Sequence, residues 1–351
     1  MTKTSTGNFF EDFRLGQTTR HATPRTMTAG DVALYTGLFG PRFAVQSSDA
    51  FAIAVGYHRA PIDDLLVFHI VFGKTVPEVS LNAIANLGYA EGRFLKPVFA
   101  GDTLSAQSEV LGTRENANRE SGIVYVRTTG FNQHQEPVLS YARWVMVRKR
   151  KADAEVAGDQ VPKLAPFVEP GELQLDAAIR IAEFDRRGTG GSLFFDDFEV
   201  GARLDHGDAM TVEDAEHMMA TRLYHNTARV HFNAHGEKDG RFGRRIVYGG
   251  HVISIARALS FNGLANAWFV RGINAGRHVA PCFGGDTVYA WSEIIGKAPA
   301  TARDDAGYLR VRTVATKDRA CADFPYKTGA EGTYDPSVIL DLDYWVLMPR
   351  A

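Results

Sequence analysis

The sequence predicts an α+β protein built from two copies of one domain, each a buried helix followed by several antiparallel strands. The strongest observation is an internal repeat. Residues 9–16 return as residues 194–201, and residues 92–103 return as residues 276–287, at offsets of 185 and 184 residues. Such a period is too long for a solenoid, so it indicates two duplicated domains.

Two shorter echoes support the duplication. Residues 27–28, Met-Thr, return as residues 210–211, and His69, in an apolar run, returns as His251. We expect these pairs to be structurally equivalent. After a duplication, one copy can keep the functional residues while the other loses them, so we expect differences between the copies to identify the functional residues.

Each copy contains one apolar run that predicts a buried helix. An Asp-Asp pair at 63–64 precedes the run 65–72, and a Gly-Gly pair at 249–250 precedes the run 251–259. Acidic residues in a first turn suit the helix dipole. Alternating segments after each helix predict strands. These strands cover residues 105–111, 122–131 and 138–147 in the first copy, and 287–295, 308–316 and 338–348 in the second.

The repeat divides the chain into three parts. Residues 1–150 are the N-terminal domain, residues 151–190 a linker and residues 191–351 the C-terminal domain. The linker is rich in proline and closes on several glycines, which is typical of a segment that runs over the surface. Within it, residues 173–184 are expected to form a short helix.

Composition limits the possible functions. The 351 residues carry a formal net charge of −2, which favours neither nucleic acid nor an anionic membrane as partner. No run approaches about 18 apolar residues, and the N-terminus lacks the apolar stretch of a signal peptide. The two cysteines are too few for a disulfide framework or a zinc site, so we expect a cytoplasmic protein without a metal.

The segments that precede the two predicted helices differ sharply. Residues 35–45 of the first copy carry one charged group, Arg42, whereas residues 224–233 of the second carry two histidines, two amides and an arginine. A lone histidine is most often an ordinary surface or helix-end residue. The asymmetry between the copies favours a functional role for the second segment.

This second segment resembles the motif of the MaoC-like hydratases, also called (R)-specific enoyl-CoA hydratases, which have the hot-dog fold. Their motif is an aromatic residue, then Ser/Thr-Gly-Asp-x-Asn-Pro-x-His, followed by a glycine-rich turn into the central helix. Here the motif histidine falls on His231 and the motif Asp falls on Asn226. The first copy has Leu38 and Phe43 at those two places. The resemblance covers nearly all of both copies.

The resemblance implies a double hot-dog protein, in which one half keeps the chemistry and the other helps to cradle coenzyme A. More narrowly, residues 34–37, 42–44 and 225–233 resemble the mesaconyl-CoA hydratases of this family. The implied reaction is the reversible hydration of mesaconyl-CoA to β-methylmalyl-CoA by a homodimer or higher homo-oligomer. No separate cofactor is implied, because coenzyme A is part of the substrate. Alternatives are another enoyl-CoA, such as itaconyl-CoA or a fatty enoyl-CoA, and a non-catalytic acyl-CoA-binding protein.

Hydration of an enoyl thioester needs a group that moves protons and a group that stabilises the thioester oxygen. His231 is the candidate for the proton transfers, and the backbone at Gly250, where the helix begins, is the candidate for the oxygen. Asn226 is the departure from the motif, because an amide cannot act as a base at neutral pH. His225, and more weakly the acidic residues 213–214, are candidates to assist His231.

The arginines favour an acyl group with a free carboxylate. Arg229 is the first candidate to bind it, because a guanidinium binds a carboxylate in a bidentate way. On an extended segment, Arg229 and His231 would project to the same face. If the segment is helical they diverge, and Arg222 or Arg245 becomes the better candidate.

The remaining candidates for substrate binding come from the motif and from basic residues of the first copy. Tyr224 is the motif aromatic residue. Arg59, Arg93 and Lys96 are candidates for a basic mouth that receives the phosphates of coenzyme A. For each basic residue, a solvated surface charge is the competing interpretation.

Overall fold

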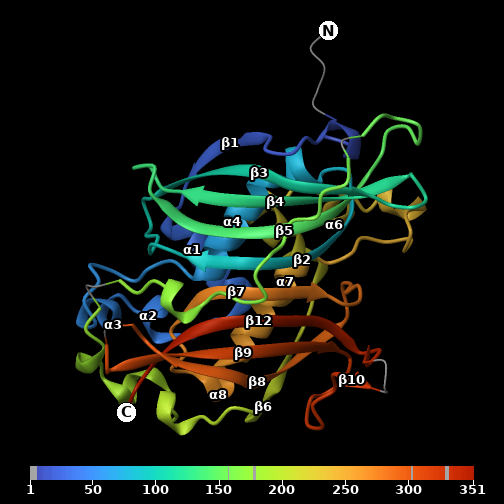
Figure 1. Cartoon of the computed structure of the whole chain (residues 1–351). Helices are drawn as coiled ribbons and strands as arrows, with labels where there is room; N and C mark the ends of the chain where they lie inside the picture. Colours follow the sequence, from blue (N-terminus) through green and yellow to red (C-terminus); the bar gives the residue numbers. More distant parts are fainter. Residues whose placement is uncertain (1–5, 157, 177–178, 302, 329–331) are drawn as a thin grey trace.

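The computed structural model describes residues 6–156, 158–176, 179–301, 303–328 and 332–351. A ten-stranded antiparallel sheet runs through the molecule in the order β1-β3-β4-β5-β2-β7-β12-β9-β8-β6. It curves around two long helices, α4 (Asp64–Thr75) and α7 (Gly249–Leu259), which both lie on one side of it (Figure 1). The predicted α+β architecture is confirmed.

The strand order is symmetric about its centre. The N-terminal half supplies β1 (Thr18–Thr26), β2 (Ala83–Phe94), β3 (Thr103–Glu115), β4 (Ser121–Phe131) and β5 (Pro137–Arg148). The C-terminal half supplies β6 (Arg203–Thr211), β7 (Phe269–His278), β8 (Thr287–Pro299), β9 (Ala306–Lys317) and β12 (Val338–Pro349). A separate small hairpin pairs β10 (Lys327–Thr328) with β11 (Thr333–Tyr334). The six predicted strands are therefore present, whereas β1, β2, β6 and β7 were not predicted.

Strands β2 and β7 join the two halves. Tyr89 lies opposite Gly276, and Gly92 lies opposite Ile273. Each of these pairs is the image of the other at an offset of 184 residues, so a pseudo-twofold axis passes between them. The duplication that the repeat predicted is therefore confirmed, and the structure relates the two copies by a pseudo-twofold axis.

Shorter helices complete the fold. The α-helices are α1 (Ala29–Phe39), α2 (Ala44–Ser47), α3 (Asp49–Ala54), α5 (Asp214–Leu223), α6 (Arg229–Phe232) and α8 (Phe261–Leu264). Single turns of other helix types are Phe10–Asp12, Val76–Ser80, Pro170–Glu172, Ile181–Glu183, Arg186–Thr189, Phe195–Asp197 and Gly236–Asp239. In the described part of the chain, no helix is long and apolar enough to cross a membrane.

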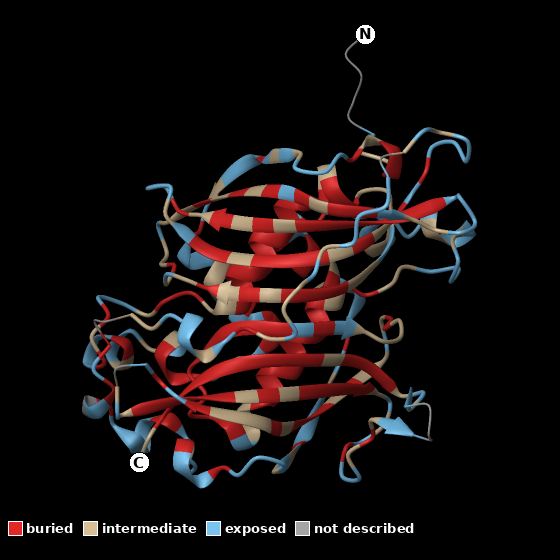
Figure 2. Ribbon diagram, viewed as in Figure 1, coloured by how far each residue is buried: buried red, intermediate tan, exposed pale blue. Residues whose placement is uncertain are grey.

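The segments that precede the long helices cross from one half to the other. Tyr35 on α1 donates a hydrogen bond to Ser254 of α7, at 2.9 Å. Gly73 of α4 lies so close to the second-copy motif that an added Cβ would stand 1.8 Å from the carbonyl oxygen of Tyr224. Both helices share one hydrophobic core, which is the buried centre of the molecule in Figure 2. A site at either helix therefore draws on both halves.

Two of the expected equivalences are wrong. Thr26 pairs with Thr103 through their hydroxyl groups at 2.8 Å, and Thr211 pairs in the same way with Thr287 at 2.9 Å. The offset here is 185 residues, so residues 27–28 do not correspond to residues 210–211. The Met-Thr pair of the second copy lies two residues before the positions that correspond to residues 27–28, so the matching residue types are a coincidence.

His69 and His251 are not equivalent either. Counted from the first residue of each long helix, His69 corresponds to Ser254. The two side chains meet where the halves face each other, with His69 Nε2 2.9 Å from Ser254 Oγ. His251 lies one turn nearer the start of α7.

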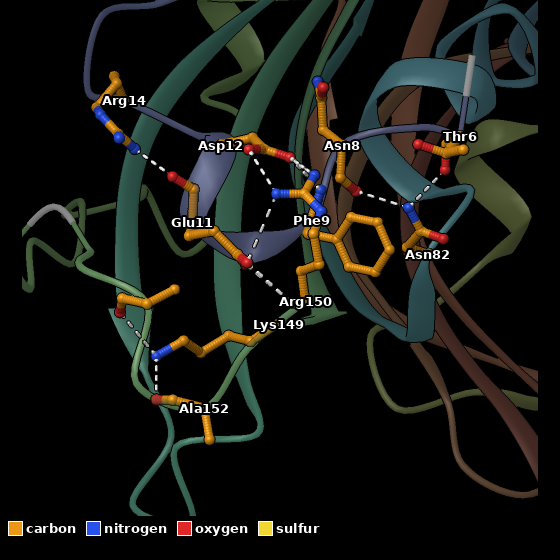
Figure 3. Close-up of polar contacts among 11 residues, drawn as sticks. Thr6, Asn8, Phe9, Glu11, Asp12, Arg14, Asn82, Lys149, Arg150 and Ala152 are labelled. Carbon is orange, nitrogen blue, oxygen red and sulfur yellow. Dashed lines mark hydrogen bonds and ion pairs between the residues drawn. The ribbon is translucent and has the colours of Figure 1, made fainter. Parts of the chain in front are cut away.

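The N-terminal half is closed by contacts between its first and last residues, shown in Figure 3. The backbone N–H of Arg150 donates to Glu11 at 2.9 Å, and the Arg150 guanidinium contacts Asp12 at 2.8 Å. The C-terminal half repeats the arrangement with Arg350 and Asp196, which are 3.1 Å apart. In each half, polar contacts thus join the beginning of the repeat to its end.

The linker packs more deeply than expected. Its Val168 and Phe184 are buried in a second apolar cluster with Trp345 of β12, and the Trp345 indole donates to the Val168 carbonyl at 2.9 Å. The expected helix over residues 173–184 is wrong where the structure describes it, because only a short 3₁₀ turn forms there, at Ile181–Glu183; residues 177–178 lie outside the described part.

Candidate active site

His231 lies on the short helix α6, and its ring faces the start of α7. Its Nδ1 lies 3.0 Å from the carbonyl oxygen of Ile246. A carbonyl only accepts, so Nδ1 carries the proton of the neutral ring and Nε2 keeps a free lone pair. Burial lowers the pKa of His231 to about 4. Nε2 has no hydrogen-bond partner among the described residues, which leaves an unprotonated nitrogen available as a base at neutral pH.

Asn226 shapes the turn that begins α6. Its Oδ1 accepts the backbone N–H of Ala228 at 3.1 Å, the bond by which an Asn side chain stabilises a turn. Its Nδ2 is buried and has no partner within the described chain. A buried donor left unpaired costs about 1–3 kcal/mol, so a bound water or substrate oxygen would be stabilised there. Neighbouring His225 is exposed, so the two side chains do not share one environment.

The N-terminus of α7 is open. No side chain caps this helix, and the backbone N–H groups of Gly249 and Gly250 have no partner among the described residues. Neither glycine has room for a side chain. A Cβ at Gly249 would lie 2.2 Å from the His278 ring, and one at Gly250 would lie 2.3 Å from Tyr248. Glycine therefore allows aromatic rings to pack directly against the uncapped N-terminus of α7.

Neutral rings surround this end of α7. The ring centroids of Tyr248 and His217 lie 5.5 and 6.1 Å from that of His231, and His251 lies 5.4 Å from His217. Burial lowers the pKa of His217 to about 2 and that of His251 to about 3. In the described part of the chain, no Asp or Glu side chain hydrogen-bonds to any of these rings or to Asn226. Among the described residues, no carboxylate therefore takes the place of the motif Asp.

The acidic candidates for that role lie at the surface. Asp214 pairs with Arg245 at 2.9 Å, and its side chain is 67% exposed. Glu213 is also exposed. Neither contacts His231, so the structure does not bring them into the site.

His278 and Tyr89 belong to the site but were missed in the sequence, as was His217. His278 Nε2 lies 3.1 Å from the Tyr89 hydroxyl, and the two residues come from opposite halves across the junction of β2 and β7. The first copy has Phe94 at the place of His278. That difference lies between residues 92–103 and 276–287, the most similar segments of the two copies, so a position-by-position comparison would have found it.

The structure separates Arg229 from His231. Both lie on the single helical turn of α6, where residues two apart point in different directions. Arg229 is exposed, and the assumption that it shares a face with His231 is wrong because the segment is not extended. Arg222 is exposed and bonds its own helix, and Arg245 is held by Asp214.

The candidate residues for coenzyme A lie toward the N-terminus of the other helix, α4. Arg59 donates to Ala100 at 3.3 Å, Arg93 pairs with Glu172 of the linker at 2.8 Å, and Lys96 pairs with Glu136 at 2.5 Å. Tyr89 of strand β2 lies beside His278 of the site, and the chain runs from there past the end of β2 at Phe94 to Lys96. The structure therefore does not bring these three residues together with His231.

Tyr224, in contrast, lies inside the cluster. It is fully buried, and its ring centroid is 4.7 Å from that of His69 and 6.0 Å from that of Tyr248. Burial raises the pKa of its hydroxyl well above 10. Tyr224 is thus a neutral part of the wall between the halves.

Residues 1–329 match the mesaconyl-CoA hydratase family. The chain is 62% identical over 348 residues to the β-methylmalyl-CoA dehydratase of Chloroflexus aurantiacus, covering 99% of each chain. It is 54% identical over 349 residues to the mesaconyl-CoA hydratase of Cereibacter sphaeroides, covering 99% of this chain and 100% of the other.

The fold has close counterparts among solved structures. The crystal structure of a MaoC domain protein from C. aurantiacus superposes with a TM-score of 0.97 over the whole of both chains, at 61% identity. A double hot-dog protein from Mycobacterium tuberculosis superposes with a TM-score of 0.72 over 98% of each chain, at 25% identity. The predicted double hot-dog fold is confirmed, and the chain belongs to the mesaconyl-CoA hydratase family of MaoC-like hydro-lyases.

Proposed function

We propose that this chain catalyses the reversible addition of water to mesaconyl-CoA, which forms β-methylmalyl-CoA. The observation that carries the proposal is the free Nε2 of His231 beside the uncapped N-terminus of α7. The high identity to a mesaconyl-CoA hydratase and a β-methylmalyl-CoA dehydratase supports the choice of substrate.

His231 can perform both proton transfers. Nε2 takes a proton from water while the water oxygen bonds to the β-carbon, and the electron pair of the double bond moves toward the thioester oxygen. The resulting imidazolium then returns its proton to the α-carbon as the thioester carbonyl re-forms, so His231 ends neutral. A single imidazole reaches one face of the double bond, so both hydrogen and hydroxyl add to the same face.

The helix start and Asn226 stabilise this reaction without moving protons. The backbone N–H groups of Gly249 and Gly250 stabilise the negative charge on the thioester oxygen. The buried Nδ2 of Asn226 donates to the attacking water, because its Oδ1 is already used in the turn to Ala228. Coenzyme A is part of the substrate, and the scheme needs no further cofactor.

The test follows the absorbance of the enoyl-thioester band after the protein is mixed with mesaconyl-CoA. A catalytic decrease, with β-methylmalyl-CoA as product, is expected. Asn226 in place of Asp is the feature that favours a non-catalytic acyl-CoA-binding protein. Binding of mesaconyl-CoA by calorimetry without any loss of absorbance would establish that alternative and overturn the proposal.

A further inference from the structure

Two guanidinium groups are buried in the core of this protein. Arg143 on β5 is 0% exposed, and Arg257 on α7 is 6% exposed. Each lies over the face of a phenylalanine ring, Arg143 at 4.2 Å from the centroid of Phe72 and Arg257 at 3.5 Å from that of Phe43. Lysine and arginine are almost never fully buried unless they are paired, so both positions need a physical explanation.

The two guanidinium groups occupy corresponding places in the two halves. Arg143 donates to the Thr75 hydroxyl at 2.7 Å, and Arg257 donates to the Ser260 hydroxyl at 3.3 Å. Counted from the first residue of each long helix, Thr75 and Ser260 hold the same position. The pseudo-twofold axis thus relates the two charges, although a strand supplies one and a helix the other.

Only one of the two charges has anionic neighbours. Asp63 and Asp64, at the N-terminus of α4, lie close enough to Arg257 for its charge to oppose the rise in their pKa that burial causes. Arg257 forms no ion pair with either carboxylate in the described part of the chain, but both lie near enough to offset part of its charge. The N-terminus of α4, the equivalent of the open end of α7, is filled by these carboxylates of the chain itself.

Arg143 has no such compensation. Its guanidinium bonds three neutral acceptors, Thr75, Ser80 and Asn86, and its Nε has no partner among the described residues. In the described part of the chain, no carboxylate forms an ion pair with it. Glu78, in the turn after α4, is bonded instead to His21 at 2.8 Å. An unpaired buried charge costs several kcal/mol, so an anion that reached it would be strongly stabilised.

Arg143 borders the wall of the candidate active site. Its partner ring, Phe72, lies 5.5 Å from the ring of Tyr248, and Tyr248 lies 5.5 Å from His231. Tyr248 precedes α7 as Asp63 precedes α4. By the pseudo-symmetry, Arg143 therefore lies near the N-terminus of α7, in the same way that Arg257 lies near the N-terminus of α4, where the two carboxylates are.

We propose that Arg143 is the residue that receives the free carboxylate of a dicarboxylic enoyl-CoA, which takes the place that Asp64 fills in the other half, while the thioester oxygen takes the place of Asp63. This inference rests on the proposed function, and it replaces Arg229 as the candidate. A monocarboxylic enoyl-CoA would leave the guanidinium unpaired, so Arg143 selects against fatty acyl chains as well as for the dicarboxylic group.

The test compares kcat/KM for mesaconyl-CoA and for crotonyl-CoA, which lacks the second carboxylate, in Arg143→Met and the parent protein. The variant should lose mesaconyl-CoA turnover by at least about 30-fold, the factor that corresponds to about 2 kcal/mol. Turnover of crotonyl-CoA should be unchanged or improved. Arg257→Met, an equally buried arginine at the other end, is the matched control and should leave the ratio of the two substrates unchanged.

An equal loss for both substrates in Arg143→Met would overturn the inference, since it would mean damage to folding or to the thioester oxygen site. If that variant does not fold, Arg143→Lys keeps the charge without the planar fork and should still lower the ratio; an unchanged ratio would then refute it. If the parent protein hydrates neither substrate, the proposed function fails. The carboxylate site is then judged separately, from the ratio of the two dissociation constants in the same variants.

Discussion

The two long helices have the same place in their halves but opposite chemistry at their first residues. Helix α4 begins with an acidic pair, and the Asp63 carboxylate accepts the N–H of Leu65 at 2.8 Å. Helix α7 begins with two glycines whose N–H groups have no partner among the residues that the structure describes. One helix dipole is thus neutralised by the chain, while the other can act on a bound anion. The two copies therefore share one architecture, but only the second has a helix N-terminus that is available to a substrate.

The short helices that cover these two helix ends also differ, because only the one beside α7 carries a histidine. The short helices α2 and α6 both begin with a turn in which the third residue bonds the preceding cap, Gln46 to Phe43 and His231 to Ala228. Gln46, rather than the expected Phe43, therefore holds the place of His231. Its amide donates to Asp64 at 3.2 Å. The α4 end has a glutamine in place of the imidazole, and it has carboxylates where a substrate oxygen would bind.

The largest expected effect comes from removing the imidazole of His231, which the α4 end replaces with Gln46. His231→Ala should lower kcat for hydration by at least about 100-fold, because it removes the group that accepts and returns the proton. Gln46→Ala, at the equivalent place, should change kcat by less than about threefold. Initial rates at the enoyl-thioester band measure both. Equal losses would show that the two ends do not differ in function.

Closing the open helix end should have the next largest effect. Gly250→Ala would place a Cβ 2.3 Å from Tyr248 and 2.5 Å from His69, so both rings must move. We expect about a tenfold or greater loss of kcat and about 1–3 kcal/mol of lost stability. Gly37→Ala, on α1 with no atom within 4 Å of the new Cβ, should instead stabilise by about 0.5–1 kcal/mol. Full activity in Gly250→Ala would exclude this helix end from the chemistry.

The two ends should also respond oppositely to pH. Burial lowers the pKa of His251 to about 3, so between that value and about 6.5 the unfolded chain binds more protons and stability rises with pH. Burial raises the pKa of Asp64 to about 7, so from about 4 to 7 the folded chain binds more protons and stability falls with pH.

Each group contributes at most about 1.4 kcal/mol per pH unit. In urea unfolding at pH 5 and pH 7, His251→Phe should therefore reduce the gain in stability at higher pH, and Asp64→Asn should increase it. Parallel pH profiles in both variants and the parent protein would contradict the assigned protonation states.

The smallest effect is expected at the basic residues of the α4 end. Lys96→Ala breaks an exposed ion pair with Glu136, and such pairs contribute about 0.2–1 kcal/mol. The KM for mesaconyl-CoA should rise by less than about threefold, since Lys96 lies away from His231. A tenfold rise would place the coenzyme A phosphates at the α4 end and support the original assignment of Lys96.

Much of the fold was predictable because its signals are local. Apolar runs and alternating segments identified both long helices and six strands, and the repeat implied two domains of the same fold. The central strands β2 and β7 were missed. Strand β2 contains Gly88, where a Cβ would lie 2.3 Å from the Trp144 ring, so its pairing depends on neighbours that are distant in sequence. The strands that join the halves were therefore missed, as were the edge strands β1 and β6.

The site, like the fold, has features that the sequence predicted and features that only the tertiary structure decided. The sequence alone determined the duplication, the catalytic candidates His231 and Asn226, and the half that holds them, because these residues form one contiguous motif that differs between the copies. Only the tertiary structure decided that α6 is helical, which removes Arg229, and that Arg143 is buried without an anion. A side chain's charge is local, but its compensation depends on which groups from both halves surround it, and packing alone decides that.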